Sequence, residues 1–374
     1  MRGKRIWVLA GVCMLALFGC GKGKKEETGS STMFIGKCYT EDGIVNFRST
    51  PNGKVDYFDY KTGTYRPLCG APNCLHDGED CFSIYLKKYV SLIGRLGDKW
   101  YYQKASDGSS VFCYSDLDGQ NEKEIGICSH QNALSADLFF DHFCILATED
   151  YFVDEETGEI SENSKSGIYR YDLETGKEEL LVPELESLHM GYSVYGRYGN
   201  LLAYLELTDE KELKYELRVM DLENGNITKP LGDMRLWIAA SYAMDGELLV
   251  CNIWEGDFWK VIELNVESGE WREILKDQKG ATRIIWGPDL KLLETLDTEQ
   301  GYCWKTYQYT EQGECVLLRE DWEEHLFAPL VIQEDRIIGF YHGGDWDMYT
   351  DFDMAVIGRE DYLAGKNDFT RLQY

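Results

Sequence analysis

Apolar and polar residues alternate in short runs along most of the chain, and each run leads into a polar turn that contains glycine. The clearest runs read IYRYDLETGK, LRVMDLENGN and VIELNVESGE, at residues 168–177, 217–226 and 261–270. Alternation of this kind is typical of a β-strand with one buried face. Glycine has no Cβ and can adopt the positive φ that a short hairpin turn requires. The pattern therefore predicts an all-β protein built from hairpins.

These hairpins recur at a regular interval. With weaker copies of the pattern included, the turn glycines are Gly63, Gly119, Gly176, Gly225, Gly269 and Gly313, spaced 44 to 57 residues apart. A strand-rich unit that repeats about every 40–50 residues indicates a blade of a β-propeller. We expect seven four-stranded antiparallel blades at about 33–68, 82–129, 134–184, 188–232, 233–277, 280–320 and 325–374, with six or eight as alternatives. In the last blade, residues 363–367 take the place of the glycine turn.

The composition agrees with a β-rich protein and limits its partners. Aromatic residues make up 13% of the chain, and 37 glycines stand against 7 prolines, which suits pleated strands joined by tight turns. The formal net charge is −28. Such a surface repels nucleic acids and anionic lipid head groups, so we expect no nucleic-acid partner.

The N-terminus carries an export signal. Three basic residues within the first five precede an apolar stretch at residues 6–18, which is too short to span a bilayer. It ends in Leu17-Phe18-Gly19-Cys20, which resembles the lipobox of bacterial lipoproteins. We expect a signal peptide at 1–19, a lipid on Cys20, a flexible tether at 20–32 and a single propeller domain at 33–374. The lipid would be the protein's contact with the membrane, and the domain would face outside the cytoplasm. A plain secretory signal is the alternative.

Three cysteines and a histidine lie close together in the segment CGAPNCLHDGEDC at residues 69–81. Cys69, Cys74, His76 and Cys81 form a ligand set that suits zinc. Copper(I) or an iron–sulfur cluster is also compatible with soft ligands of this kind. Disulfides, common in exported proteins, and simple packing of small apolar side chains are the competing interpretations.

The cysteine-rich segment is expected to form a surface connection. It falls between the last strand of the first blade and the first strand of the second, which predicts that it lies on the face that carries the loops between second and third strands. Pro72 would stiffen the first gap between cysteines, and Gly78 can supply a positive φ in the last.

The hairpins, the lipobox and this segment together resemble a known group. They are similar to uncharacterised propeller lipoproteins of Firmicutes, whose blades are like the YWTD propellers of the low-density-lipoprotein receptor. The Leu-Cys-x4-Cys-x-His-x4-Cys pattern, here residues 68–81, is the more specific part of the resemblance. The resemblance implies a propeller fold and a cell-surface address, and it implies no activity.

Two loops mix aromatic residues with carboxylates on the expected loop face. Aromatic rings stack on sugars or cations, and carboxylates accept hydrogen bonds from hydroxyl groups. A glycan, a peptide or another protein is therefore the expected ligand. Calcium is a weaker alternative, because the aspartates of the second loop lack the EF-hand spacing. The candidate residues are Trp254, Asp257 and Trp259 in one loop and His342, Asp345, Trp346 and Asp347 in the other.

The sequence thus favours a binding module at the cell surface and assigns no catalytic residue. It has no nucleophile–base motif, no phosphate-binding glycine loop and no HExxH helix. The alternative is a propeller enzyme, a lyase or hydrolase, with its active site at the central channel mouth. His189, His325 and His342 are its candidate residues. A structural scaffold in a surface complex is a third possibility.

Overall fold

Antiparallel sheets make up nearly all of the regular structure in the computed structural model of the chain. Two short helices, α1 (Phe82–Tyr89) and α2 (Arg359–Leu363), are the helices of the described part. The structure describes residues 32–34, 37–40, 42–46, 54–78, 80–106, 109–130, 133–140, 142–153, 160–236, 242–256, 258–287, 289–297, 303–310, 312–322, 326–342 and 353–372.

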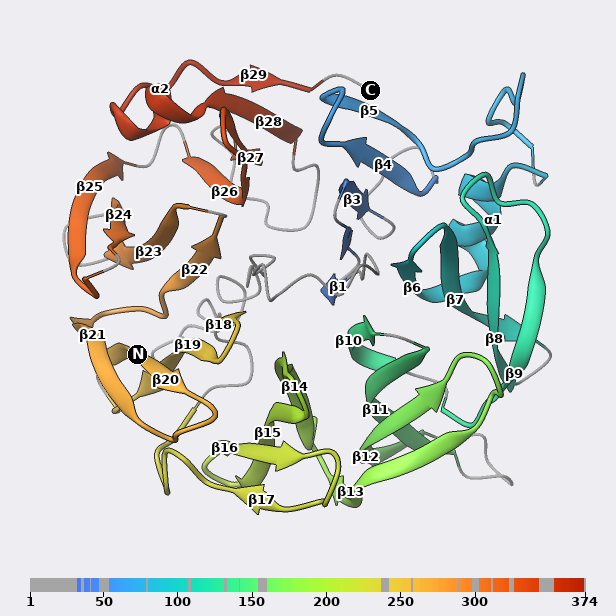
Figure 1. Cartoon of the computed structure of the whole chain (residues 1–374), viewed down its shortest axis with the longest axis horizontal. Coiled ribbons are helices and arrows are strands. Elements are labelled where there is room, and N and C mark those ends of the chain that lie inside the picture. The colour runs from blue at the N-terminus through green and yellow to red at the C-terminus, as the bar shows by residue number, and fades with distance from the viewer. Residues whose placement is uncertain are drawn as a thin grey trace, which may run out of the picture. The chain divides into compact units, whose positions relative to one another are not determined.

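Seven sheets follow one another along the chain, and in each sheet the strands pair in chain order (Figure 1). By their internal contacts the residues form two compact parts. The first part contains the first four sheets except residues 214–217, which begin the third strand of the fourth sheet and belong with the last three sheets to the second part.

The first part is built from seventeen strands. They are β1 (Thr32–Phe34), β2 (Lys37–Tyr39), β3 (Gly43–Asn46), β4 (Asp56–Asp59) and β5 (Thr64–Pro67); β6 (Val90–Leu96), β7 (Lys99–Ser106), β8 (Ser109–Asp116) and β9 (Lys123–Cys128); β10 (Ala133–Phe140), β11 (Phe143–Val153), β12 (Ile160–Asp172) and β13 (Glu178–Ser187); and β14 (Tyr192–Tyr198), β15 (Leu201–Asp209), β16 (Lys214–Asp221) and β17 (Ile227–Thr228).

The second part is built from twelve strands. They are β18 (Tyr242–Asp245), β19 (Leu248–Trp254), β20 (Trp259–Asn265) and β21 (Trp271–Gln278); β22 (Arg283–Trp286), β23 (Lys291–Asp297), β24 (Cys303–Tyr309) and β25 (Cys315–Trp322); and β26 (Leu326–Ile332), β27 (Arg336–His342), β28 (Asp353–Gly358) and β29 (Thr370–Arg371).

These sheets are the blades of a seven-bladed β-propeller, which confirms the fold class predicted from the sequence. Within the first part, the leading strand of one sheet contacts the leading strand of the next, as β6 contacts β10 and β10 contacts β14. Within the second part, β18 contacts β22 and β22 contacts β26. Six blades have four strands, and the first has five because β1 adds to its leading edge.

The turn chemistry explains why the repeated motif specifies a hairpin. All six turn glycines have positive φ, between 65° and 82°. In the clearest copy, Asp172 Oδ1 accepts hydrogen bonds from the N–H groups of Glu174 and Thr175 at 2.9 and 2.8 Å. The N–H of Gly176 donates to the carbonyl of Asp172 at 2.9 Å. The aspartate thus shapes the turn, and the glycine takes the backbone conformation that other residues avoid.

Burial differs between inner and outer strands of the blades. Strand β22 is buried along its whole length, whereas most residues of β13 and β25 are exposed or half-buried. Inner strands have neighbouring blades on both faces, so they tolerate continuous apolar runs. The repeated motif lies between these extremes, on the third strand of a blade, and in β16 this strand is buried at six successive positions.

The structure adds two helical turns that the pattern did not predict. Helix α1 lies between β5 and β6, with Phe82 and Leu86 buried one helical turn apart. In the last blade, α2 links β28 to β29, and Gly365 ends it with φ 74°. Helices this short leave too few residues for a clear helical period.

Candidate metal centre

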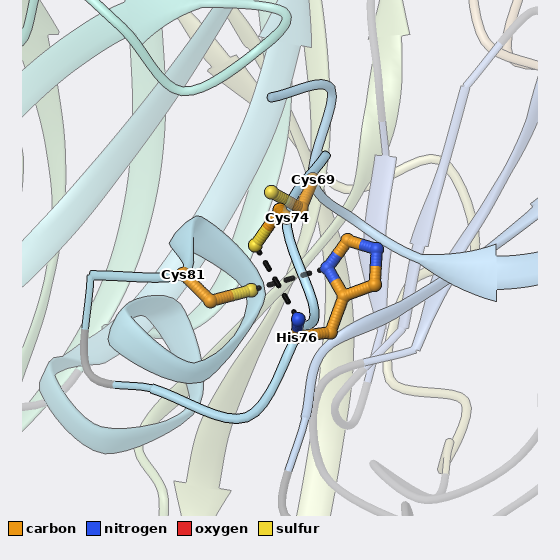
Figure 2. A group of neighbouring side chains, drawn as sticks. All are labelled: Cys69, Cys74, His76 and Cys81. Carbon is orange, nitrogen blue, oxygen red and sulfur yellow. Dashed lines mark hydrogen bonds between the residues drawn. The ribbon is translucent and has the colours of Figure 1, made fainter. Parts of the chain in front are cut away.

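Residues 68–81, here called the cysteine connection, run from the end of β5 to the start of α1. This agrees with the prediction that the segment links the first blade to the second. Figure 2 shows the side chains of Cys69, Cys74, His76 and Cys81 gathered in one place, with Cys81 approaching from the start of the helix. The four residues are the candidate metal ligands named from the sequence.

A tight turn brings the first two cysteines together. The N–H of Cys74 donates to the carbonyl of Ala71 at 3.3 Å, and Asn73 has φ 61°. A proline at the second position of a turn and a residue with positive φ at the third position are typical of a type II turn. Pro72 therefore directs the chain back on itself, as the sequence suggested.

The second reversal of the chain occurs at His76 and not at Gly78. His76 has φ 56°, whereas Gly78 is not among the residues with positive φ. The expectation that Gly78 would supply the left-handed conformation was therefore wrong. A non-glycine residue in this region costs free energy, about 1–3 kcal/mol, and persists where its surroundings hold it. Here the strained backbone places the imidazole of His76 beside the thiols.

The four ligand atoms have the spacing of a closed tetrahedral site. They all lie within 4.8 Å of one another, and His76 Nδ1 is 3.4 Å from Cys81 Sγ. Four ligands at about 2.0–2.3 Å from a shared zinc ion lie about 3.5–3.8 Å apart. Adjustments of about an ångström would complete such a site, so the residues present fit a zinc ion.

Burial sets the chemistry of the thiols. Cys69 and Cys81 are buried, and Cys74 and His76 are partly buried. Burial raises the pKa of the Cys81 thiol to about 11, because a thiolate is disfavoured away from water. The N–H of His76 donates to Cys74 Sγ at 3.4 Å and lowers the pKa of that thiol. A bound cation would stabilise thiolates at both positions.

The cysteine connection and the start of α1 that follows it are packed against both blades that they join. Gly70 lies against Asp118 so closely that an added Cβ would be 2.8 Å from the Asp118 side chain, and a Cβ on Gly119 would meet Phe82 at 2.3 Å. On the other side, Ser83 Oγ donates to the carbonyl of Val55 at 2.6 Å. The connection therefore links the first blade to the second.

This packing corrects the expected placement on one loop face. Val55 ends the connection between β3 and β4, but Asp118 and Gly119 belong to the hairpin turn between β8 and β9. The connection thus touches a loop of each kind. Helix α1, which was not predicted from the sequence, extends the segment so that it contacts loops of both kinds.

The cysteines whose side chains the structure describes show no pairing. These nine are free thiols, namely Cys69, Cys74, Cys81, Cys113, Cys128, Cys144, Cys251, Cys303 and Cys315. Five of those outside the connection are buried and pack as small apolar side chains.

The expected ligand face is described only in part. Trp254 and Trp259 face each other across β19 and β20 with ring centroids 6.3 Å apart. The guanidinium of Arg235 lies 4.0 Å from the Trp254 ring. His342 ends β27, and Asp257, Asp345, Trp346 and Asp347 lie outside the described residues. The described part of this face thus includes an aromatic loop, residues 254–259 without Asp257, whose Trp254 ring is covered by the guanidinium of Arg235.

Of the candidate histidines, His189 is exposed, whereas His325 and the side chain of His342 lie outside the described part of the structure. The histidine that sequence reasoning missed is His130, which is 6% exposed. Its Nδ1 contacts Asp150, and its ring lies 3.9 Å from the Tyr169 ring. Nothing local in the sequence marks it, because Asp150 and Tyr169 reach it from β11 and β12.

The comparisons with known proteins bear on the fold. No protein-family model matches the sequence, and no curated protein matches it. An acylaminoacyl peptidase in complex with Z-Gly-Gly-Phe-chloromethyl ketone is similar with a TM-score of 0.57 at 12% identity, over 92% of this chain and 52% of that chain. The uncomplexed acylaminoacyl peptidase of Pyrococcus horikoshii gives 0.55 at 12% identity, over 92% and 53%. The chain therefore spans about half the length of these structures, and likeness at this identity shows the fold alone.

Proposed function

We propose that this protein is a lipid-anchored, extracytoplasmic β-propeller that binds a ligand or partner protein at the cell surface, and that a structural zinc ion holds its cysteine connection. The observation that carries the metal part of the proposal is the convergence of four protein ligand atoms within 4.8 Å. A site whose four positions are all filled by protein is structural, because a catalytic zinc keeps one position for water or substrate.

The role of the zinc ion would be to hold the junction between two blades. The cysteine connection is loop between Leu68 and Cys81, and it carries two residues with positive φ that are not glycine. A metal that binds the folded loop and not the unfolded chain stabilises the folded state. Zinc would thereby order a connection that has little regular structure of its own.

The membrane anchor rests on the N-terminal sequence. Leu17-Phe18-Gly19-Cys20 is similar to a lipobox, and the tether that follows is polar. Neither α1 nor α2, the helices of the described part, has the length and apolar character needed to cross a bilayer. The proposed address outside the cytoplasm also suits a protein whose net charge keeps it from nucleic acids.

Metal analysis of the processed protein, purified without oxygen, tests the metal part. We expect about one zinc per chain, lost in Cys74→Ser and retained in Cys315→Ser, which removes a partly buried thiol outside the connection. A protein with no metal and with oxidised connection cysteines would contradict the proposal.

Membrane fractionation tests the anchor. The protein should sediment with membranes, and Cys20→Ala should release it or block its processing, because the acyl chains supply the membrane affinity. A protein that stays in the soluble fraction with Cys20 intact would contradict the lipid anchor and leave the zinc site standing.

A further inference from the structure

A hollow of about 450 Å³ lies between the second and third blades of the first part. This volume is within the range of small-molecule sites, about 300–1,000 Å³. Its lining comes from the sheet β6–β9 and from the turn that joins β12 to β13. The lining residues are Leu96, Asp98, Lys99, Tyr101, Tyr114, Lys123, Glu124, Ile125, Leu173 and Glu174.

The pairing of the strands explains the wall of the hollow. Gly94 pairs with Tyr101, Tyr101 with Tyr114, and Tyr114 with Lys123. Side chains in directly paired positions share one face of a sheet. Tyr101, Tyr114 and Lys123 therefore share one face of the sheet, and the two tyrosines form the wall of the hollow beside Leu96 of β6.

The apolar part of the hollow is mainly aromatic. The Tyr101 and Tyr114 rings have centroids 5.7 Å apart and are inclined at 41°. Both residues are partly exposed, and Leu173, which lines the hollow from the third blade, is buried. Partly exposed rings of this kind provide flat apolar surfaces with a polar hydroxyl at one end.

Charged groups of both signs surround this aromatic wall. The ammonium of Lys99 lies 4.3 Å from the Tyr114 ring centroid, and that of Lys123 lies 6.0 Å from it. Burial, together with the nearby Tyr114, Asp98 and Glu174, raises the pKa of Tyr101, so these two carboxylates act on the same tyrosine. With Glu124, three carboxylates and two ammonium groups line the hollow.

The charged groups and tyrosine rings that line the hollow favour one class of ligand over others. A polyanion would meet three carboxylates on a chain of net charge −28, and its binding would be repelled. A cation that seeks an aromatic ring would meet Tyr114, whose ring already has two lysines near it. A neutral polyhydroxyl compound avoids both conflicts, because its hydroxyl groups donate to carboxylates and accept from ammonium groups while its C–H faces pack on tyrosine.

We propose that this hollow binds a short neutral saccharide, stacked on Tyr101 and Tyr114 and hydrogen-bonded by Lys99, Lys123 and the surrounding carboxylates. The inference rests on the proposed binding function and names its ligand class. The binding surface proposed here lies on the second and third blades, whereas the sequence led us to expect it at the aromatic loop of the fifth blade.

Isothermal titration of the processed, zinc-loaded protein with maltose, cellobiose and lactose tests this inference, with spermidine and digalacturonate as charged comparators. At least one neutral disaccharide should bind about tenfold more tightly than either comparator. Tyr114→Leu should weaken that binding about tenfold. The control Tyr198→Leu changes a partly exposed tyrosine of β14 and should alter binding less than about twofold.

Saturation-transfer NMR keeps the test decisive if Tyr114→Leu does not fold. Tyr101→Leu should then reduce the transfer from aromatic protons to sugar C–H groups, with native zinc content as the check on folding. No binding by any of the three disaccharides, tighter binding of a charged comparator, or transfer unchanged in a folded variant would overturn the inference. A protein that is anchored and zinc-loaded but binds no disaccharide would contradict this inference alone. A protein that binds a disaccharide without being anchored would contradict the proposed address alone.

Discussion

The cysteine connection and the aromatic loop look equally promising in the sequence, yet the structure separates them. The connection brings four soft ligand atoms within 4.8 Å of one another. The aromatic loop places Arg235 on Trp254 and Lys279 on Phe258, and Lys260 bonds Glu255 and Glu273. Residues with useful chemistry indicate a site when the fold leaves that chemistry available, and here cations from outside the aromatic loop already contact Trp254, Phe258 and Glu255.

The largest effect is expected from removing a metal ligand. Cys81→Ser should weaken zinc binding by more than about 100-fold, because an alcohol replaces a thiolate in the ligand set. Zinc competition with a chromophoric chelator measures this. Trp254→Ala in the aromatic loop is the matched comparison, and a similar loss of zinc there would remove the distinction between the two regions.

A pair of glycine substitutions tests how closely helix α1 packs on the β8–β9 turn of the second blade. Gly119→Ala should destabilise the protein by about 3 kcal/mol, because the new Cβ would meet Phe82 and the φ of 82° is unfavourable. Gly225→Ala, at a φ of 72° with nothing within 4 Å, should cost about 1 kcal/mol. Urea denaturation measures both. Equal losses would show that α1 does not press on the turn.

The internal pairing of the aromatic loop can be broken without touching the metal. Lys260→Met should cost about 1–2 kcal/mol, because Lys260 is 9% exposed and bonds two carboxylates. Lys279→Met, which removes a cation from above the exposed Phe258 ring, should cost about 0.5 kcal/mol. Thermal melts with parallel zinc analysis test this, and loss of zinc in either variant would contradict the account.

A smaller, pH-dependent effect is expected beside the cysteine connection. Burial by itself raises the pKa of Glu122, but bonds from Lys104 and Tyr102 lower it below its ordinary value of 4.5. A carboxylate with a lowered folded pKa stabilises the protein above its unfolded pKa and loses that contribution as the pH falls through the folded value.

Glu122→Gln should therefore cost about 1 kcal/mol at pH 7, since the group is partly exposed. The difference from the parent protein should shrink below about pH 4. Denaturation at both pH values measures it, and a difference that grows toward acid would refute the assignment.

The sequence predicted most of the fold because its signals are local. The Asp-x-x-x-Gly turn at residues 172–176 depends on hydrogen bonds within five residues. Helix α1 escaped prediction because its stability comes from contacts with Gly119 and Val55, far away in the chain.

The candidate metal site was visible for the same reason, since its four ligands lie within thirteen residues. What the sequence did not reveal is assembled from distant strands. His130 meets Asp150 and Tyr169, and the hollow joins Tyr101 to Leu173. Both groups of residues depend on which side chains become buried, and that burial depends on how whole blades pack against each other.

Zinc X-ray absorption on the processed protein, purified without oxygen, tests the central claim most directly. The account predicts three sulfur atoms at about 2.3 Å and one nitrogen atom at about 2.0 Å from the metal, with no oxygen ligand. A first shell that contains water or carboxylate oxygen, or zinc content that survives Cys69→Ser and Cys81→Ser together, would contradict it.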